Sequence, residues 1–229
     1  MLTLYLQAPF ATFRPFGAGS FRQTAGFITP SAAYGLLLNV AGIEMRADEG
    51  KEMTVIRKGL PTVRLGLGAL SLPQHHSIYQ QLHNYPIGAD AGKDYVAGAK
   101  GSKYNISPGR RAFLSGIRAY VCLDGNSELE QHVLDGLAGR RPRQYGLPFL
   151  GDNNFLVERL EPVQRREPAY WFQRLDDADE ESPHEGVTRL TVTIDRADLS
   201  RTRSALFAPT AEPSIYIPES AWTEVRYGG

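Results

Sequence analysis

The chain has 229 residues, of which 42% are hydrophobic, and its 25 basic residues balance its 25 acidic ones, so it can bury the core of one larger domain or of two small ones. No apolar run approaches the roughly 20 residues that span a bilayer, and the N-terminus lacks the basic segment of a signal peptide, so we expect neither a membrane partner nor secretion. The single cysteine, Cys122, excludes an internal disulfide and predicts a protein of the reducing cytoplasm.

Residues 2–8 alternate leucine with other residues, which is the pattern of a strand with one buried face. A loop of glycine, arginine and phenylalanine follows at 13–22, and then an apolar segment with helical spacing. Thr29 is suited to cap that helix, Pro30 to occupy its first position and Gly42 to end it. Because N–H groups at a helix start attract phosphate, this segment predicts an anion site beside a basic, aromatic loop.

Two further strands are predicted at 53–57 and 62–72, with Gly66 and Gly68 inside the second. The two glycines fit a bulge, a close backbone approach or a twisted sheet edge, and the pattern does not separate these.

Residues 73–110 are a long polar, glycine-rich and basic stretch, and such a length is typical of a functional or a disordered segment. We expect a projecting hairpin or finger, with residues 111–123 returning as a strand. Residues 51–118 hold ten Lys or Arg against three acids, whereas six acids lie within 176–185. The clustered positive charge favours a polyanion as partner, and the acidic segment is typical of a solvated connector.

A second helix is predicted at 127–137, with Ser127 as its cap and Glu130 completing a capping box. A loop rich in arginine follows at 140–154. The remaining strands are expected at 155–160, 170–172, 186–195 and 222–227. The order β–α–β–β–α–β over residues 1–165 predicts an α+β, ferredoxin-like domain, and residues 166–229 form a small β-rich region.

Basic and aromatic residues in three segments are the candidates for contact with RNA. They are Arg14, Phe16, Arg22, Thr29, Ser31 and Tyr34 around the first helix; Lys100, Lys103, Tyr104, Arg110 and Arg111 in the finger; and Arg140, Arg141, Arg143 and Tyr145 in the arginine loop. The alternatives are that the phenylalanines fill the core and that the finger is a disordered loop. Gly17 and Gly19 match neither a Walker loop nor a dinucleotide fingerprint, so no nucleotide cofactor is expected.

His75, His76 and His83 cluster at the start of the finger and could serve a nuclease or a zinc site. A fourth zinc ligand is missing nearby, and no cysteine helps. We therefore predict ordinary polar residues at these positions, with no catalytic residue and no metal.

Four segments carry a resemblance to a known family: the strand Leu2–Leu6, the loop Phe13-Arg-Pro-Phe16, the helix start Ile28-Thr-Pro-Ser-Ala-Ala-Tyr-Gly-Leu-Leu37, and Gln144-Tyr-Gly-Leu-Pro-Phe-Leu-Gly151. Over about residues 1–165 the chain resembles the CRISPR-associated Cas-five family of RAMP proteins, which are subunits of type I Cascade effectors. The resemblance implies an RRM-like domain with a protruding thumb at about 73–111. It also implies a grip on the 5′ handle of the CRISPR RNA, beside the Cascade backbone subunits and the large subunit.

Some members of this family cleave precursor RNA with a Tyr/Lys/His constellation, which does not align onto this chain. The resemblance therefore implies a binding subunit without enzymatic activity, and it leaves open whether this subunit touches target DNA near the protospacer-adjacent motif. Two alternatives remain. One is a processing endoribonuclease that uses a histidine of the finger near Lys100 or Lys103. The other is a generic RRM-like RNA-binding module.

Overall fold

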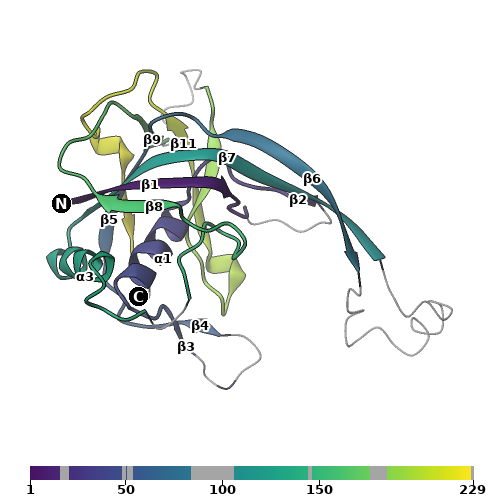
Figure 1. Cartoon of the computed structure of the whole chain (residues 1–229), viewed down its shortest axis with the longest axis horizontal. Helices are drawn as coiled ribbons and strands as arrows, with labels where there is room; N and C mark the ends of the chain where they lie inside the picture. The colour runs from purple at the N-terminus through teal and green to yellow at the C-terminus, as the bar shows by residue number, and fades with distance from the viewer. Residues whose placement is uncertain are drawn as a thin grey trace.

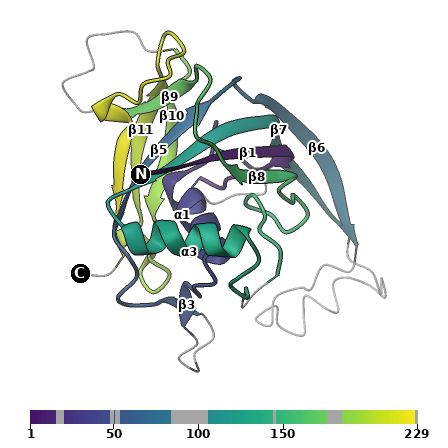
Figure 2. The ribbon, with the colours of Figure 1, turned by 60° about the vertical axis from the view of Figure 1, so that its left-hand side comes forward.

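The computed structural model describes residues 1–15, 21–47, 50, 54–83, 106–143, 146–175 and 185–227. A ten-stranded sheet dominates these residues, and its main path runs β10-β11-β9-β5-β7-β1-β8, with β2, β6 and β12 paired to members of that path. Helices α1 (Pro30–Val40) and α3 (Ser127–Leu137) lie together on one side of the sheet (Figure 2). The described chain is thus an α+β protein, as predicted, and neither α-helix within it is long and apolar enough to cross a membrane.

The strands are β1 (Leu2–Ala11), β2 (Phe21–Arg22), β3 (Arg46–Ala47), β4 (Val55–Ile56), β5 (Val63–Ala69), β6 (Gln74–His83), β7 (Ile106–Asp124), β8 (Arg159–Pro162), β9 (Tyr170–Arg174), β10 (Thr188–Thr193), β11 (Arg203–Pro209) and β12 (Trp222–Val225). Two 3-10 turns, η2 (Leu199–Arg201) and η3 (Glu219–Ala221), precede β11 and β12. The short strands β3 and β4 pair with each other, apart from the large sheet.

Four antiparallel strands, in the order β8-β1-β7-β5, form the centre of the sheet. With the helices, these four strands follow one another along the chain as β1, α1, β5, β7, α3 and β8, with β2, β3, β4 and β6 between them in the sequence. The alternation in β1 explains its place: Leu2, Leu4 and Leu6 are 9%, 0% and 0% exposed and join the core under α1.

Local signals determine both helix starts, but the sequence-based prediction is correct for only one of them. The Thr29 hydroxyl accepts a hydrogen bond from Ala32 N at 3.1 Å and Pro30 opens α1, as predicted. In α3 the predicted capping box is wrong. The cap is Asn126, whose extended backbone lets its side chain accept from Leu129 N at 2.9 Å, so Ser127 is already helical.

Long-range pairing produced the other differences. The strand expected at 155–160 begins only at Arg159, because Phe149 and Leu156 form a local bridge within the preceding loop. Beyond residue 165, β9 and β12 both pair with β5, so this region extends the same sheet. Trp171 of β9 also explains Gly68: a Cβ at Gly68 would lie 2.8 Å from its ring, which identifies a close approach.

Strands β6 and β7 form a long antiparallel hairpin that leaves the body of the molecule, from Gln74 opposite Ser115 to His83 opposite Ile106 (Figure 1). The predicted finger is therefore strand up to residue 83, and residues 84–105 lie outside the described part. β7 has 19 residues, and its C-terminal part is the central strand of the body, between β1 and β5. The hairpin is thus anchored in the core. Cys122, on this part of β7, is fully buried.

Candidate nucleic-acid interface

The start of α1 belongs to the core and not to a binding surface. Thr29, Ser31 and Tyr34 are 3%, 8% and 0% exposed. The two hydroxyls lie 3.0 Å apart and form a hydrogen bond, while the phenol donates to Pro61 O at 2.7 Å. The prediction that these three side chains contact RNA is therefore wrong for this structure, because their polar atoms are used internally and no surface is left for a phosphate.

The loop before α1 divides into buried and exposed residues. Phe13 is 3% exposed and lies in the core, so the alternative interpretation of this phenylalanine holds. Phe13 N donates to the Thr24 hydroxyl and Ala25 N donates to Phe13 O, so the two limbs of the loop lie side by side. Arg14 and Arg22 are exposed, and they form no ion pair or hydrogen bond with the described part of the chain.

The arginine loop does not present three guanidiniums to one anion. Arg140 pairs with Asp135 at 2.6 Å, and its hydrogen bond to that carboxylate lowers the pKa of Asp135. Arg141 Nε donates to Ala41 O at 2.8 Å and so binds the carbonyl at the end of α1. Arg143 alone is exposed without a partner among the described residues. The predicted cluster is thus reduced to one available arginine.

Arg110 and Arg111 are neighbours on β7, so their side chains leave opposite faces of the hairpin. We call the face of Arg111, Phe113 and Ser115 the outer face. The face of Arg110 and Leu114 is the inner face, because Leu114 is fully buried in the core on the side of the helices.

Arg111 binds other side chains of the protein and is therefore not free to bind a ligand. It forms an ion pair with Asp152, both side chains being mostly covered, and its guanidinium lies 5.4 Å from the centre of the Phe155 ring. Partial burial alone would raise the pKa of Asp152, but hydrogen bonds from Asn154 and Arg111 and the Arg111 charge outweigh it, and the pKa lies below its usual value. Arg111 thus holds the arginine loop against the hairpin.

This ion pair predicts a pH-dependent contribution to stability. The lowered pKa of Asp152 means that its stabilisation is complete above the unfolded-state value, near about 3.9, and is lost as pH falls through the folded value. At pH 7, Asp152→Asn should therefore reduce the free energy of unfolding by about 1 kcal/mol, and the difference from wild type should shrink as the pH falls below the unfolded-state pKa and through the lowered folded-state pKa. Urea unfolding at several pH values measures this. An equal loss in an Arg111→Gln background would assign the effect to another partner.

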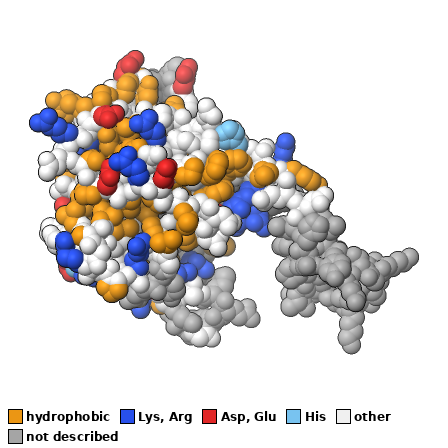
Figure 3. All heavy atoms as spheres, viewed as in Figure 1, with side chains coloured by type: hydrophobic (Ala, Val, Ile, Leu, Met, Phe, Trp, Pro, Cys, Tyr) orange, Lys and Arg blue, Asp and Glu red, His pale blue; other side chains and the backbone are white. Residues whose placement is uncertain are grey.

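The outer face carries an aromatic cluster that the sequence did not reveal. Phe10 and Phe113 meet edge to face at 5.6 Å, Phe155 lies 6.2 Å from Phe113, and the His76 ring stacks on Phe113 at 5.2 Å. His76 is also hydrogen-bonded to the Ser115 hydroxyl at 2.7 Å. Figure 3 shows hydrophobic side chains gathered where the hairpin leaves the body. The sequence gives no signal for this cluster, because the long-range pairing of β7 with β1 and with β6 brings its members together.

On the inner face, aromatic side chains and an arginine are exposed side by side, and this combination suits the binding of nucleic acid. Tyr79 of β6 and Phe21 of β2 are both register partners of Arg110, so the three side chains share this face. Tyr79 is 64% and Phe21 44% exposed, and Arg110 has no partner in the described part of the chain. Aromatic rings beside a free guanidinium offer stacking and phosphate contact to a single strand.

The histidines do not converge on one centre. His75 and His76 are consecutive on β6, so they lie on opposite faces, and His76 is engaged by Ser115 and Phe113. Within the residues that the structure describes, no group of three His, Cys, Asp or Glu side chains could hold a metal ion. Five predicted RNA contacts lie outside the described residues: Phe16, Lys100, Lys103, Tyr104 and Tyr145.

Comparisons with known proteins give a likeness of fold and not of sequence. No protein-family model matches the chain, and no curated protein matches it. A solved chain described as a CRISPR RNA-guided surveillance complex is similar over 93% of this chain and 91% of its own length, with a TM-score of 0.57 and 16% identity. A second structure, described as a Cas protein, aligns over 96% of this chain and 98% of its own length, with a TM-score of 0.48 and 16% identity.

Proposed function

We propose that this chain is a non-catalytic RNA-binding subunit of a CRISPR effector complex of the Cascade type, in which it caps the 5′ handle of the CRISPR RNA. The observation that carries the proposal is the likeness of fold, over nearly the whole of both chains, to a chain of a CRISPR RNA-guided surveillance complex. The same proposal assigns the chain to the Cas-five family of RAMP proteins, whose resemblance rests on the segments around Phe13, Thr29 and Gly146.

Two features of the fold support this assignment. The antiparallel order β8-β1-β7-β5, with a helix after β1 and another after β7, agrees with a ferredoxin-like or RRM-like domain. The hairpin of β6 and β7 occupies the position of the expected thumb, and we assign it that role. On this proposal, the thumb separates the handle from the first guide segment, beside a backbone subunit and the large subunit.

The distribution of charge supports the inner face as the side that meets RNA. Arg110 of this face is exposed and lacks a partner among the described residues, whereas Arg111 of the outer face is held by Asp152. Arg14 and Arg22 are also exposed without described partners, and Arg22, the register partner of Arg111, lies on the outer face. A free guanidinium that neutralises a phosphate releases a counterion from the RNA, which favours binding. A guanidinium that is already paired with a carboxylate gains less free energy from the same contact.

Co-expression with Cascade subunits and a repeat–spacer RNA tests the proposal. We expect the chain to purify with the backbone subunits and with RNA whose 5′ end is protected from nuclease digestion. A chain that purifies alone, or with RNA but no CRISPR subunit, would contradict the Cascade assignment and favour a generic RNA-binding module. Incubation of the purified chain with repeat RNA in EDTA tests the non-catalytic part, because cutting that is abolished in His75→Ala would identify a processing endoribonuclease.

A further inference from the structure

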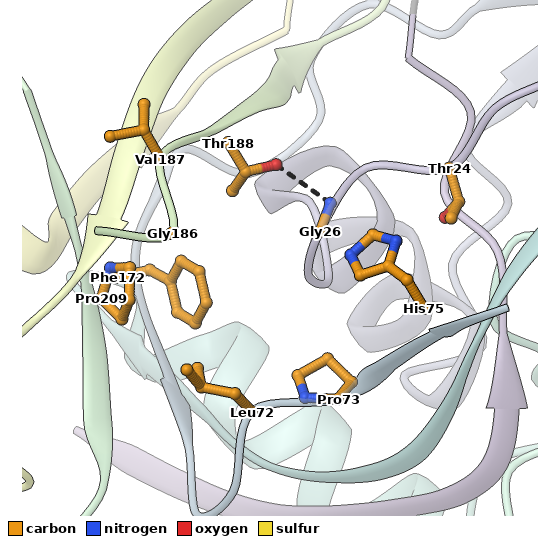
Figure 4. A pocket seen from close by; sticks show the side chains of 10 residues that line it. All are labelled: Thr24, Gly26, Leu72, Pro73, His75, Phe172, Gly186, Val187, Thr188 and Pro209. Carbon is orange, nitrogen blue, oxygen red and sulfur yellow. Dashed lines mark hydrogen bonds between the residues drawn. The ribbon is translucent and has the colours of Figure 1, made fainter. Parts of the chain in front are cut away.

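A pocket of about 340 Å³ opens at the root of the hairpin, where the chain passes from β5 to β6 (Figure 4). Segments far apart in the sequence build it: the loop after β2, the start of β6, and strands β9, β10 and β11. Its lining consists of Thr24, Gly26, Leu72, Pro73, His75, Phe172, Gly186, Val187, Thr188 and Pro209. The volume lies at the low end of the range of about 300–1,000 Å³ for small-molecule sites, which suits a single nucleoside.

The walls of the pocket are apolar and its polar groups are few. Leu72 and Pro73 lie on one side, and the rings of Phe172 and His75 face the cavity from opposite sides (Figure 4). Phe172 is held rigidly, because its ring stacks on Phe27 at 4.1 Å with an interplanar angle of 5°. Two flat rings on either side of a cavity are suited to a planar aromatic ligand.

Two polar groups in the lining remain available to a ligand. The Thr188 hydroxyl oxygen accepts from Gly26 N at 2.9 Å, which leaves its proton free to donate. The His75 ring has no hydrogen-bond partner in the described part of the chain. Thr24 is already used, since it accepts from Phe13 N and donates to Ala25 O. One hydroxyl donor and one imidazole match the mixed donor and acceptor edge of a nucleobase.

The charge of the lining decides whether a base or a phosphate fits the pocket. Among the residues that the structure describes, neither a lysine nor an arginine lines the pocket, so no described side chain there would neutralise a phosphate. The inner face of the hairpin supplies the missing charge, because Ser77, Tyr79 and then Arg110 continue outward on the face of His75. A strand could thus keep its phosphates near Arg110 while one base turns into the pocket.

We propose that this pocket receives one unstacked base of a single-stranded RNA that passes along the inner face of the hairpin. The inference rests on the proposed function, since it assumes that RNA is the ligand of this face. It adds a base-binding site built by His75, Phe172 and Thr188, none of which belongs to the RNA contacts expected from the sequence. A Cβ at Gly26 would lie 3.1 Å from the Thr188 hydroxyl oxygen and 3.6 Å from His75 Nε2, so a methyl group there would crowd Thr188 and narrow the pocket.

Photocrosslinking with octauridine that carries 4-thiouridine tests the site, with binding measured by fluorescence anisotropy. We expect crosslinks to peptides that contain His75 or Thr188, and an affinity weaker by at least about fivefold and up to about 150-fold for His75→Ala, the range that stacking on one base covers. His76→Ala is the matched control. It removes the neighbouring imidazole from the outer face and should leave affinity and crosslinks within about twofold of wild type. Gly26→Ala, which narrows the pocket, should resemble His75→Ala.

The outcomes separate this inference from the proposed function. If wild type binds the oligonucleotide but crosslinks only outside the pocket, or if His75→Ala and His76→Ala behave alike, the base site is overturned while RNA binding stands. If wild type binds no RNA, both fall. If His75→Ala leaves RNA binding intact but prevents purification with partner subunits, the occupant is a protein side chain, and the base site is again overturned.

Discussion

Replacement of Gly151 by alanine is expected to lower the free energy of unfolding by about 3 kcal/mol or more. Gly151 has a φ of +78°, and an added Cβ would lie 1.5 Å from Thr12 O and 2.7 Å from the Thr12 carbonyl carbon. Both are backbone atoms, so no side-chain rotation relieves the overlap. The loop and the end of β1 are joined there by a hydrogen bond from Thr12 N to Leu150 O at 3.1 Å, and the clash would break it.

Gly139→Ala provides the matched control for this prediction. Gly139 has a similar φ of +73°, but nothing lies within 4 Å of its Cβ position. The substitution should therefore destabilise the protein by only about 1 kcal/mol, the cost of the left-handed backbone alone. Urea unfolding of both variants gives the comparison. Equal losses of stability would mean that the contact between the loop and Thr12 contributes nothing to stability.

Removal of the three free arginines on the hairpin side should produce the largest change in RNA affinity. In Arg14→Ala/Arg22→Ala/Arg110→Ala, the affinity for octauridine at 0.1 M salt should fall at least about tenfold. The slope of log affinity against log salt should decrease in magnitude by about 2, because each phosphate of a single strand that an arginine no longer neutralises reduces the slope by about 0.7. Anisotropy titrations at four salt concentrations measure both quantities.

A second triple variant keeps the change in net charge the same. Arg64, Arg159 and Arg201 are paired with Glu219, Glu161 and Asp198, on other parts of the surface. Their replacement by alanine should leave the salt slope nearly unchanged, because paired surface arginines contact no RNA in the proposed arrangement. If the two triple variants weaken RNA binding equally, binding follows total charge and the free arginines at the hairpin do not form the RNA surface.

The ends of a helix could be predicted from the sequence where they depend on local chemistry. Thr29, Pro30 and Gly42 mark the two ends of α1 because capping and left-handed turns depend on the residues at those positions alone. The misplaced cap of α3 shows the limit of such signals. Asn126 and Ser127 are both good caps, and the extended backbone of Asn126, with φ of −149° and ψ of 91°, is what makes it the cap.

The candidate site was less predictable, because it depends on partners distant in the sequence. The pattern of arginines gave no indication that Ala41 O binds Arg141 or that Asp152 binds Arg111. Burial of Tyr34 likewise depends on its bond to Pro61 O and on the stacked ring of Tyr227. A charged or aromatic residue in a sequence thus reveals what it can bind, whereas the fold decides whether that capacity is still available.

Because β7 continues from the hairpin into the body of the sheet, the length of the hairpin can change only in fixed steps. Each pair of residues inserted into β6 and matched in β7 would move everything beyond it outward by about 7 Å and keep every side chain on its own face. A single inserted residue would instead exchange the two faces and bring Tyr79 to the aromatic side. The paired part of the hairpin can therefore change length only in steps of two residues, about 7 Å each, if every side chain is to keep its face.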